Sequence, residues 1–249
     1  MQSALTLYFF TTGTRTPLIA LLALRRPKNL VPILFAYAGL GLVAVIVRDP
    51  AAAIFALAPA PLVGPALARF ARAREETVGA LVTGTIGLSF PLLIAAIPGV
   101  GALPDQMPLP LGPNVNIALF AFVIGAALAS SVPLFRDAIL PIVDGARYVA
   151  LAAILGATAV TAVAFVDLRS VGVAALMLLV GTVCAAIGAI LFGGDGIAAA
   201  LGAGTRDPAV TAAFAISAGL AGGAAVPLAY TALLVLSLGV GKLLIARQA

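Results

Sequence analysis

Long uncharged runs are the feature that most limits how this chain can fold. Residues 170–192 contain no charged side chain, and further apolar runs of similar length follow one another along the chain. In lipid, backbone polar groups must be hydrogen-bonded within their own segment, so runs of about 20 residues are expected to be membrane-crossing helices. The short alternation of apolar and polar residues typical of membrane β-barrel strands is not seen. The sequence predicts an all-α polytopic membrane protein.

Composition supports the same class. Of 249 residues, 63% are hydrophobic and 9% are charged, and the mean hydropathy is +1.20. Soluble domains average about 25% charged residues, so a water-facing surface cannot be built from this chain and the lipid bilayer is its expected partner. The net charge of +5 would suggest nucleic acid in a soluble protein. Here the cations lie between apolar runs, and no nucleic-acid partner is expected.

Cysteine and histidine content excludes two further classes. The chain has one cysteine, Cys184, inside an apolar run, and no histidine. A disulfide framework and a His/Cys metal centre are excluded, and Cys184 is expected to pack as a small hydrophobic residue. Residues 1–12 lack the basic start and the small-residue cleavage site of a secretory signal. No metal and no cofactor is expected.

Charged and Pro/Gly-rich breaks divide the sequence into nine expected membrane spans. The first covers residues 2–12 and extends toward Leu24. The linking loop, PGVGALPDQMPLPLGPNVN (98–116), separates four spans from five. One membrane domain is expected over 1–249, with an N-terminal repeat at 1–98, a linking loop at 99–115 and a C-terminal repeat at 116–249. The other eight spans are expected at 29–47, 51–71, 77–97, 116–134, 147–166, 170–192, 196–220 and 224–246.

The distribution of cations predicts an orientation. With the N-terminus outside, the inner loops carry eleven cations and the outer loops carry two, which follows the positive-inside rule. An integral inner or plasma membrane protein with a cytoplasmic C-terminus is expected. The outer cations are Arg48 and Arg169; the inner ones are Arg15, Arg25, Arg26, Lys28, Arg69, Arg72, Arg74, Arg136, Arg147, Lys242 and Arg247.

Two spans contain residues that interrupt helices. Proline removes a backbone donor and glycine lets the chain open, so the third and eighth spans are each expected to be discontinuous. They occupy corresponding positions in the two halves and run in opposite directions, a pattern typical of inverted-repeat secondary transporters. Because Gly and Pro are frequent in membrane helices, simple kinks remain the alternative. The interrupting residues are Pro61, Gly64 and Pro65 in the third span and Gly202, Gly204 and Pro208 in the eighth.

The second interruption contains a charged pair, Arg206 and Asp207. A charge near the centre of a membrane helix costs about 2.5–3.5 kcal/mol on insertion scales, so it is seldom kept without a partner or a cavity. In one interpretation the two residues neutralise each other and stabilise the crossing. In the other, Arg206 binds an anionic substrate group, with Thr205 and Asp207 beside it and the half-helix from Pro208 adding its dipole.

Hydroxyl residues follow the first interruption. Thr83, Thr85 and Ser89 lie on the fourth span, and a role for these hydroxyls at a midplane substrate cavity is one interpretation, with Thr83 as the candidate binding residue. The alternative is that these hydroxyls bond back to their own helix.

Three segments resemble the bile acid:sodium symporter family. APAPLVGPALARFARAREETVGALVTGTIGLSFPLL (58–93) resembles its fourth and fifth helices, and GAGTRDPAVTAAFAISAGLAGGAAVPLAYTALLVL (202–236) resembles its ninth and tenth. LLALRRPKNLVPILFAYAGL (21–40) is similar to the basic turn between helices two and three. The resemblance implies ten helices in two inverted five-helix repeats. The first of these ten helices is not seen in this sequence. A misassigned start, a fragment or a shortened first repeat would each explain this.

The resemblance also implies a sodium site, from which this chain departs. Sodium needs several close oxygen ligands, and only Thr83 is kept among the matched positions. The sequence therefore predicts transport that depends weakly or not at all on sodium. Either Arg206 acts as a fixed positive charge in the place of the ion, or coupling runs on protons through Asp207. The other matched positions carry Pro65, Ala66, Gly79, Gly202 and Arg206.

Taken together, these patterns predict a secondary active transporter that moves a small organic anion by alternating access. A structural or assembly subunit of a membrane complex is the alternative, since it could keep the kinks without needing a midplane arginine. An intramembrane enzyme is disfavoured, because only one of nine acidic residues, Asp207, lies inside a span. The identity of the substrate, the coupling ion and the oligomeric state stay open.

Overall fold

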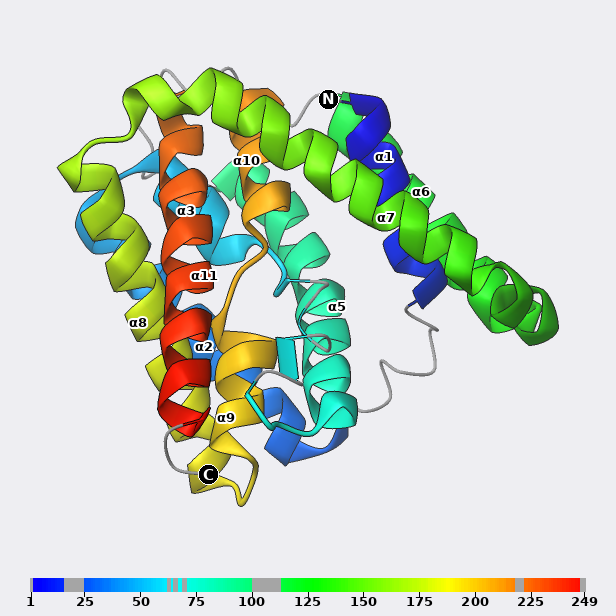
Figure 1. The fold of residues 1–249 in the computed structure, drawn as a ribbon, viewed down its shortest axis with the longest axis horizontal. Helices are drawn as coiled ribbons and strands as arrows, with labels where there is room; N and C mark the ends of the chain where they lie inside the picture. The colour runs from blue at the N-terminus through cyan, green and yellow to red at the C-terminus, as the bar shows by residue number, and fades with distance from the viewer. Residues whose placement is uncertain are drawn as a thin grey trace.

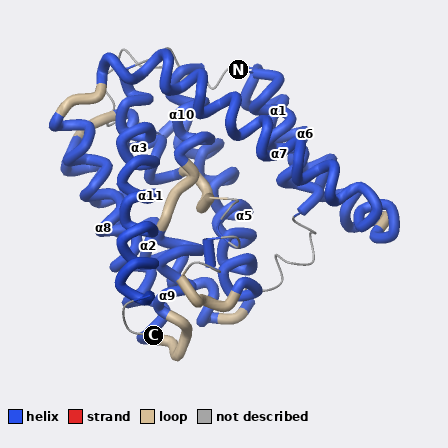
Figure 2. The backbone as a smooth tube through the Cα atoms, viewed as in Figure 1, coloured by secondary structure: helices blue, strands red, loops and turns tan. Residues whose placement is uncertain are grey.

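A computed structural model describes residues 2–15, 25–61, 64, 67–68, 71–99, 113–217 and 222–246 (Figures 1 and 2). Every regular element in these ranges is helical, which confirms the predicted all-α class. Pro65, most of the predicted linking loop and residues 16–24 lie outside the described residues. The elements are α1 (Gln2–Arg15), α2 (Pro27–Val47), α3 (Pro50–Leu57), α5 (Glu75–Gly99), α6 (Pro113–Ser131), α7 (Pro133–Ala162), η2 (Val163–Phe165), α8 (Leu168–Leu191), α9 (Gly196–Ala199), η3 (Ala200–Gly204), α10 (Pro208–Ser217), η4 (Gly222–Ala224) and α11 (Ala225–Ala246).

Four helical stretches among the described residues are long and apolar enough to cross a membrane. Their exposed side chains are largely hydrophobic, as lipid-facing surfaces require; Val45, Val160 and Leu179 are 70%, 83% and 61% exposed. These features agree with membrane embedding, whereas the nine-span arrangement stays a prediction. The four stretches are Pro27–Val47, Ala138–Phe165, Leu168–Leu191 and Gly222–Gly239.

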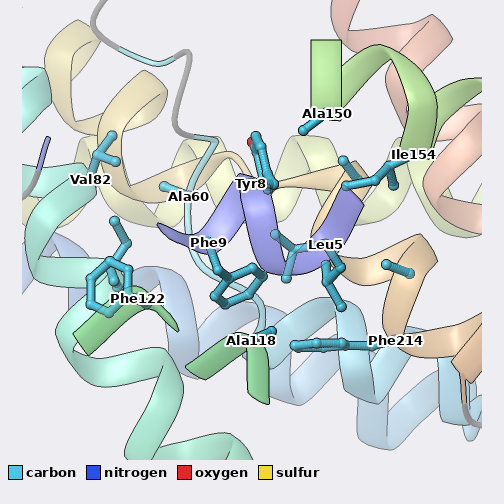
Figure 3. Close-up of a cluster of buried hydrophobic side chains, with 14 of the residues drawn as sticks. Leu5, Tyr8, Phe9, Ala60, Val82, Ala118, Phe122, Ala150, Ile154 and Phe214 are labelled. Atoms are coloured by element: carbon cyan, nitrogen blue, oxygen red, sulfur yellow. The ribbon is translucent and has the colours of Figure 1, made fainter. Parts of the chain in front are cut away.

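The helices form two groups (Figure 1). The body contains α2, α3, α5, α8, α9, α10 and α11, and the arm contains α1, α6 and α7, of which α6 and the first part of α7 extend away from the body. A cluster of buried side chains joins the two groups, with Leu5, Tyr8 and Phe9 of α1 at its centre (Figure 3). They pack against Phe122 in the arm and Phe214 of α10 in the body.

Two glycines bring α1 and α6 into backbone contact. A Cβ atom at Gly13 would overlap the carbonyl oxygen of Phe122, and one at Gly125 would overlap that of Phe10. Small residues let membrane helices approach closely and gain dispersion contacts. The arm is therefore held together by a contact that only glycine permits at these two positions.

The start of α7 differs from the prediction. Residues 135–146 were expected to form an inner loop, but they belong to α7, which begins at Pro133. Arg15 of α1 forms an ion pair with Asp144, and Arg147 lies 3.5 Å from the same carboxylate, one helical turn further on. Asp144 and Arg147 lie three residues apart and share one side of α7, so this polar segment can stay helical. Arg147, which was counted with the inner-loop cations, is consequently only 9% exposed.

Acidic residues in the turns act as helix caps. Asp49 begins α3, and Asp195 begins α9 after the turn at Gly193, whose φ is +69°. Asp167 begins α8 and exchanges hydrogen bonds with Ser170, whose backbone N–H lowers the pKa of the Asp167 carboxyl. Because an N-cap carboxylate satisfies helix amides that lack a partner, these turns end one helix and start the next.

Candidate functional site

The first interrupted helix opens after α3. The helix ends at Leu57, and residues 58–61 form no regular structure. Ala58 is extended, with φ −62° and ψ 151°, as expected for a residue that precedes a proline. The backbone N–H of Ala60, which has no helical acceptor, donates to the hydroxyl of Thr85 on α5 at 2.9 Å. A side chain of the next helix thus replaces the lost backbone bond.

The second interrupted helix opens after η3. The chain runs from α9 through a π-helical turn into extended backbone at Thr205, whose ψ is 159°, and α10 begins at Pro208. A Cβ at Gly204 would lie 2.6 Å from the Cα of Thr182, so glycine is needed where this segment crosses α8. The backbone N–H of Arg206 donates to the hydroxyl of Tyr230 on α11 at 3.1 Å.

The two interruptions contact each other. The backbone N–H of Asp207 donates to the carbonyl oxygen of Pro59 at 2.8 Å. The Nε of Arg206 donates to the carbonyl oxygen of Ala56, at the end of α3, at 3.4 Å. Segments from opposite halves of the chain, both predicted to be interrupted, therefore meet in one place.

Arg206 is completely buried, with an exposed fraction of 0%. Its Nη1 donates to the carbonyl oxygens of Ala203 at 2.5 Å and Thr205 at 3.0 Å. The guanidinium lies over the ring of Tyr37 on α2, 4.3 Å from the ring centroid, in a cation–π contact. Its Nη2 has no hydrogen-bond partner among the described residues. The arginine is thus held in a fixed position with one donor nitrogen unused.

Asp207 is also buried, with an exposed fraction of 1%. Its Oδ1 accepts the backbone N–H groups of Ala209 and Val210 at 3.0 and 3.1 Å and so caps the start of α10. Its Oδ2 accepts a hydrogen bond of 2.6 Å from the hydroxyl of Tyr8 on α1. The carboxylate therefore links the body to the arm.

The two charged side chains point in different directions. Both are described, and no ion pair joins them: Arg206 faces α2 and α3, whereas Asp207 faces α1 and the first turn of α10. In extended backbone, successive side chains project to opposite sides, which explains why neighbours in sequence diverge here. The interpretation that the pair neutralises itself by direct contact finds no such contact in the structure.

The hydroxyl residues of the predicted site, Thr83 on α5 and Thr205 after η3, are buried. Thr83 and Thr205 are 8% and 1% exposed, and Thr205 donates to the carbonyl oxygen of Leu201 in its own helix at 2.6 Å. On α5, Thr85 and Ser89 contact the hydroxyl of Tyr37, which donates to the Thr85 carbonyl at 3.1 Å. Ser89 thus takes part in the site through Tyr37, whereas the hydroxyl of Thr85 accepts the N–H of Ala60 and also donates to the carbonyl oxygen of Val82 in its own helix at 2.8 Å.

The predicted glycines allow close approach to α5. A Cβ at Gly202 would lie 2.9 Å from the Cβ of Leu81, and one at Gly64 would lie 2.9 Å from the side chain of Val82. Pro61 lies in the open segment after α3, and Pro208 begins α10, as predicted. These positions shape the backbone and do not present functional groups.

Three of the chain's four tyrosines contact the charged pair, and sequence reasoning did not select them. Tyr8 binds Asp207, Tyr37 lies under the guanidinium, and Tyr230 accepts the backbone N–H of Arg206. Buried tyrosine hydroxyls usually find a hydrogen-bond partner. The available signal was therefore the presence of phenol groups inside otherwise apolar runs.

Neither a model of a known protein family nor a curated protein matches this chain. The likeness to the bile acid:sodium symporter family therefore rests on the three segments quoted above, and membership of that family is a proposal.

Proposed function

We propose that this chain is a secondary active transporter of small organic anions, with its binding site where the two interrupted helices meet. One observation carries the proposal: the guanidinium of Arg206 is fully buried, and its Nη2 lacks a hydrogen-bond partner among the described residues. Leaving a buried charged donor unsatisfied costs more than leaving a neutral one unsatisfied. A carboxylate or phosphate oxygen of a substrate would satisfy this nitrogen with a charge-assisted bond.

The surroundings of Arg206 favour recognition of a planar anion. Two backbone carbonyls fix Nη1, and the ring of Tyr37 supports the guanidinium plane. Arginine presents its donors as a rigid fork, so holding the plane also holds the direction of the free donor. The dipole of α10 contributes less than the sequence suggested, because Asp207 already caps its first amides.

Matched hydrogen bonds support two inverted repeats. In each half, a backbone N–H inside the interruption donates to a hydroxyl on the following long helix: Ala60 to Thr85 and Arg206 to Tyr230. The sequence separations are 25 and 24 residues. Paired interrupted helices at a repeat interface are typical of secondary transporters, which supports a nine-span domain of four plus five helices.

The site is closed on both sides, since Arg206 and Asp207 are 0% and 1% exposed. Binding therefore requires a movement, which we assign to rocking of the arm against the body, as in other repeat-built transporters. Tyr8, 1% exposed, covers Asp207 from the arm and would part from it in that movement. Proton coupling through Asp207 is consistent with the missing sodium ligands. The proposed location is the inner or plasma membrane, with the C-terminus in the cytoplasm.

Uptake into proteoliposomes tests this function. Radiolabelled mono- and dicarboxylates are offered to the wild-type protein, to Arg206→Gln and to Arg169→Gln, a control that removes an exposed cation. Saturable uptake of one of these anions by the wild type and Arg169→Gln, and its loss in a folded Arg206→Gln, is the expected result. Uptake that survives in Arg206→Gln excludes this site. A wild-type chain that transports none of these anions would favour the alternative, a structural or assembly subunit of a membrane complex.

A further inference from the structure

A second polar site lies at the end of the body where α2 and α5 begin and α8 turns into α9. It is a pocket of about 280 Å³. Three cations from two separate segments line it: Arg26 and Lys28 at the start of α2, and Arg74 just before α5. Asn29 and Thr77 add polar groups.

The acidic residues of this pocket leave an excess of positive charge. Asp195 lines the pocket, but its Oδ1 accepts the backbone N–H groups of Ile197 and Ala198, both at 3.0 Å. Glu76 is the other lining carboxylate. Three cations against two carboxylates in a concave polar site attract anions and disfavour cations.

The pocket ends close to Arg206. Its inner lining includes Leu81 of α5 and Ala199 of α9, and both belong to a buried apolar cluster with Ile33 and Ala203. Tyr37 also packs against this cluster. The carbonyl oxygen of Ala203 accepts the Nη1 of Arg206, and Tyr37 lies under the same guanidinium. The apolar cluster of Ile33, Leu81, Ala199 and Ala203, called the Leu81 layer below, therefore connects the lining of the basic pocket to the residues that contact the buried arginine.

We infer that this pocket is the inner vestibule of the Arg206 site, where small hydrophilic anions of phosphate or carboxylate size gather before they pass the Leu81 layer. The inference rests on the proposed function for the role of Arg206. It follows from the position of the guanidinium, which lies over Tyr37 of α2, the helix whose first turn lines the pocket. A volume of about 280 Å³ accommodates a compact anion, and the polar lining favours a hydrophilic one.

Charge-selective labelling tests the vestibule. In a Cys184→Ala background, Thr77→Cys places one thiol in the pocket, and its reaction rates with an anionic and a cationic methanethiosulfonate reagent are compared at low ionic strength. One charge at ~6 Å in water changes a local ion concentration about threefold. Arg74→Gln should lower the anion rate about threefold and raise the cation rate about threefold. The anion-to-cation rate ratio should therefore fall about tenfold. Arg72→Gln, which removes an exposed cation of the same turn outside the pocket lining, should change it far less. Equal effects of the two substitutions would overturn the vestibule.

Accessibility tests the apolar layer. In the same background, Ala203→Cys should resist the anionic reagent, and adding Leu81→Ala should raise its rate at least about tenfold, because removing a buried leucine leaves a cavity. Leu40→Ala, from a different buried cluster, controls for general loosening and should leave the thiol protected. Ala36→Cys, in the same layer, replaces Ala203→Cys if that variant does not fold. A thiol that stays protected in Leu81→Ala, or that Leu40→Ala exposes equally, overturns the path.

Two further experiments show whether free anions or lipid headgroups occupy the pocket, and whether a failure concerns the pocket or the proposed function. A membrane of neutral lipid removes anionic headgroups, and protection of Thr77→Cys by inorganic sulfate in that membrane supports a vestibule for free anions. Protection by phosphatidylglycerol but not by sulfate shows a headgroup site and overturns the inference. Labelling does not depend on transport, so uptake that survives Arg206→Gln would reject the proposed function while the labelling results still report on the pocket.

Discussion

The backbone N–H of Asp207 donates to the carbonyl oxygen of Pro59, and this bond of 2.8 Å joins the interrupted helix of one half of the chain to that of the other. Proline at position 59 cannot donate, but its carbonyl is free to accept because the helix has ended two residues earlier. The open backbone of one segment thus satisfies the open backbone of the other. Neither interruption would be stable in an apolar setting by itself.

The bond between the hydroxyl of Tyr8 and the carboxylate of Asp207 should stabilise the contact of arm and body. Tyr8→Phe removes the donor from a buried, charged acceptor, and a loss of about 1.5–3 kcal/mol in unfolding free energy is expected. Denaturant unfolding in detergent micelles measures it. A double-mutant cycle with Asp207→Asn should recover most of that energy as coupling. Tyr148→Phe, at a 47% exposed tyrosine, is the control and should be near neutral.

The hydroxyls of Thr85 and Tyr230, which bind the two interruptions, should contribute a similar amount to the free energy of unfolding. Thr85→Val and Tyr230→Phe each leave a buried backbone N–H without its acceptor, which costs about 1–3 kcal/mol. Thr161→Val is the control, because that hydroxyl bonds only to carbonyls of its own helix, at Ala157 and Thr158. Unfolding midpoints of the three variants decide the matter; a control that costs as much as the other two would contradict the assignment.

Alanine at the glycines between α1 and α6 should loosen the arm. Gly13→Ala and Gly125→Ala each place a methyl group into a backbone carbonyl, and overpacking of this kind costs about 1–3 kcal/mol. Gly156→Ala on α7 meets nothing within 4 Å and should be neutral or stabilising by up to about 1 kcal/mol. Thermal unfolding compares the three variants, and a destabilised Gly156→Ala would show that the substitution alone, not the contact, is harmful.

Uptake should not require sodium. The positions matched to sodium ligands include Gly79, Gly202 and Arg206, which offer no side-chain oxygen. Proteoliposomes loaded under a sodium gradient and under a proton gradient separate the two cases, and only the second should drive accumulation if Asp207 carries the proton. A steep, saturable sodium requirement would contradict the prediction and would point to oxygen ligands from elsewhere in the chain.

The C-terminus should face the cytoplasm. Arg26, Lys28 and Arg74 line one pocket with the turn before α9, at the end of the body where α11 finishes (Figure 1). All these segments were assigned to inner loops by the cation count, so three of the cations counted as inner lie at one end of the body, which agrees with the positive-inside rule. C-terminal reporter fusions measure the orientation, and activity of an externally active reporter would mean that the span count is wrong.

Helix positions followed closely from apolar run length, because the backbone in lipid has few alternatives to a helix. The interruptions were also predicted, because proline and glycine, as at Pro61 and Gly204, disturb the helix at their own positions and need no tertiary contact to do so. The inner loop at 135–146 was wrong because its charges are paired across helices: Asp144 binds Arg15 of α1, which local sequence does not reveal. Arg147 was counted with the inner-loop cations at the start of the span 147–166, and its burial likewise depends on Asp144, 3.5 Å away.

The contents of the site were only partly predictable. Arg206 and Asp207 stood out as charges in an apolar run, but their divergence depends on extended backbone that sequence adjacency conceals. The tyrosines reach the pair from α1, α2 and α11, so their role depends on tertiary structure. A tyrosine hydroxyl in an apolar run could bond to many different partners, and the partner is decided only by how the helices pack.

The stacking of Arg206 on Tyr37 has an evolutionary consequence. The ring of Tyr37 supports the guanidinium, and its hydroxyl is held in turn by Ser89 and the Thr85 carbonyl. A lineage that lost the cation at position 206 would have no use for a polar ring at position 37, and selection on Ser89 would relax with it. Positions 37, 89 and 206 should therefore be inherited as a unit, changing together or not at all.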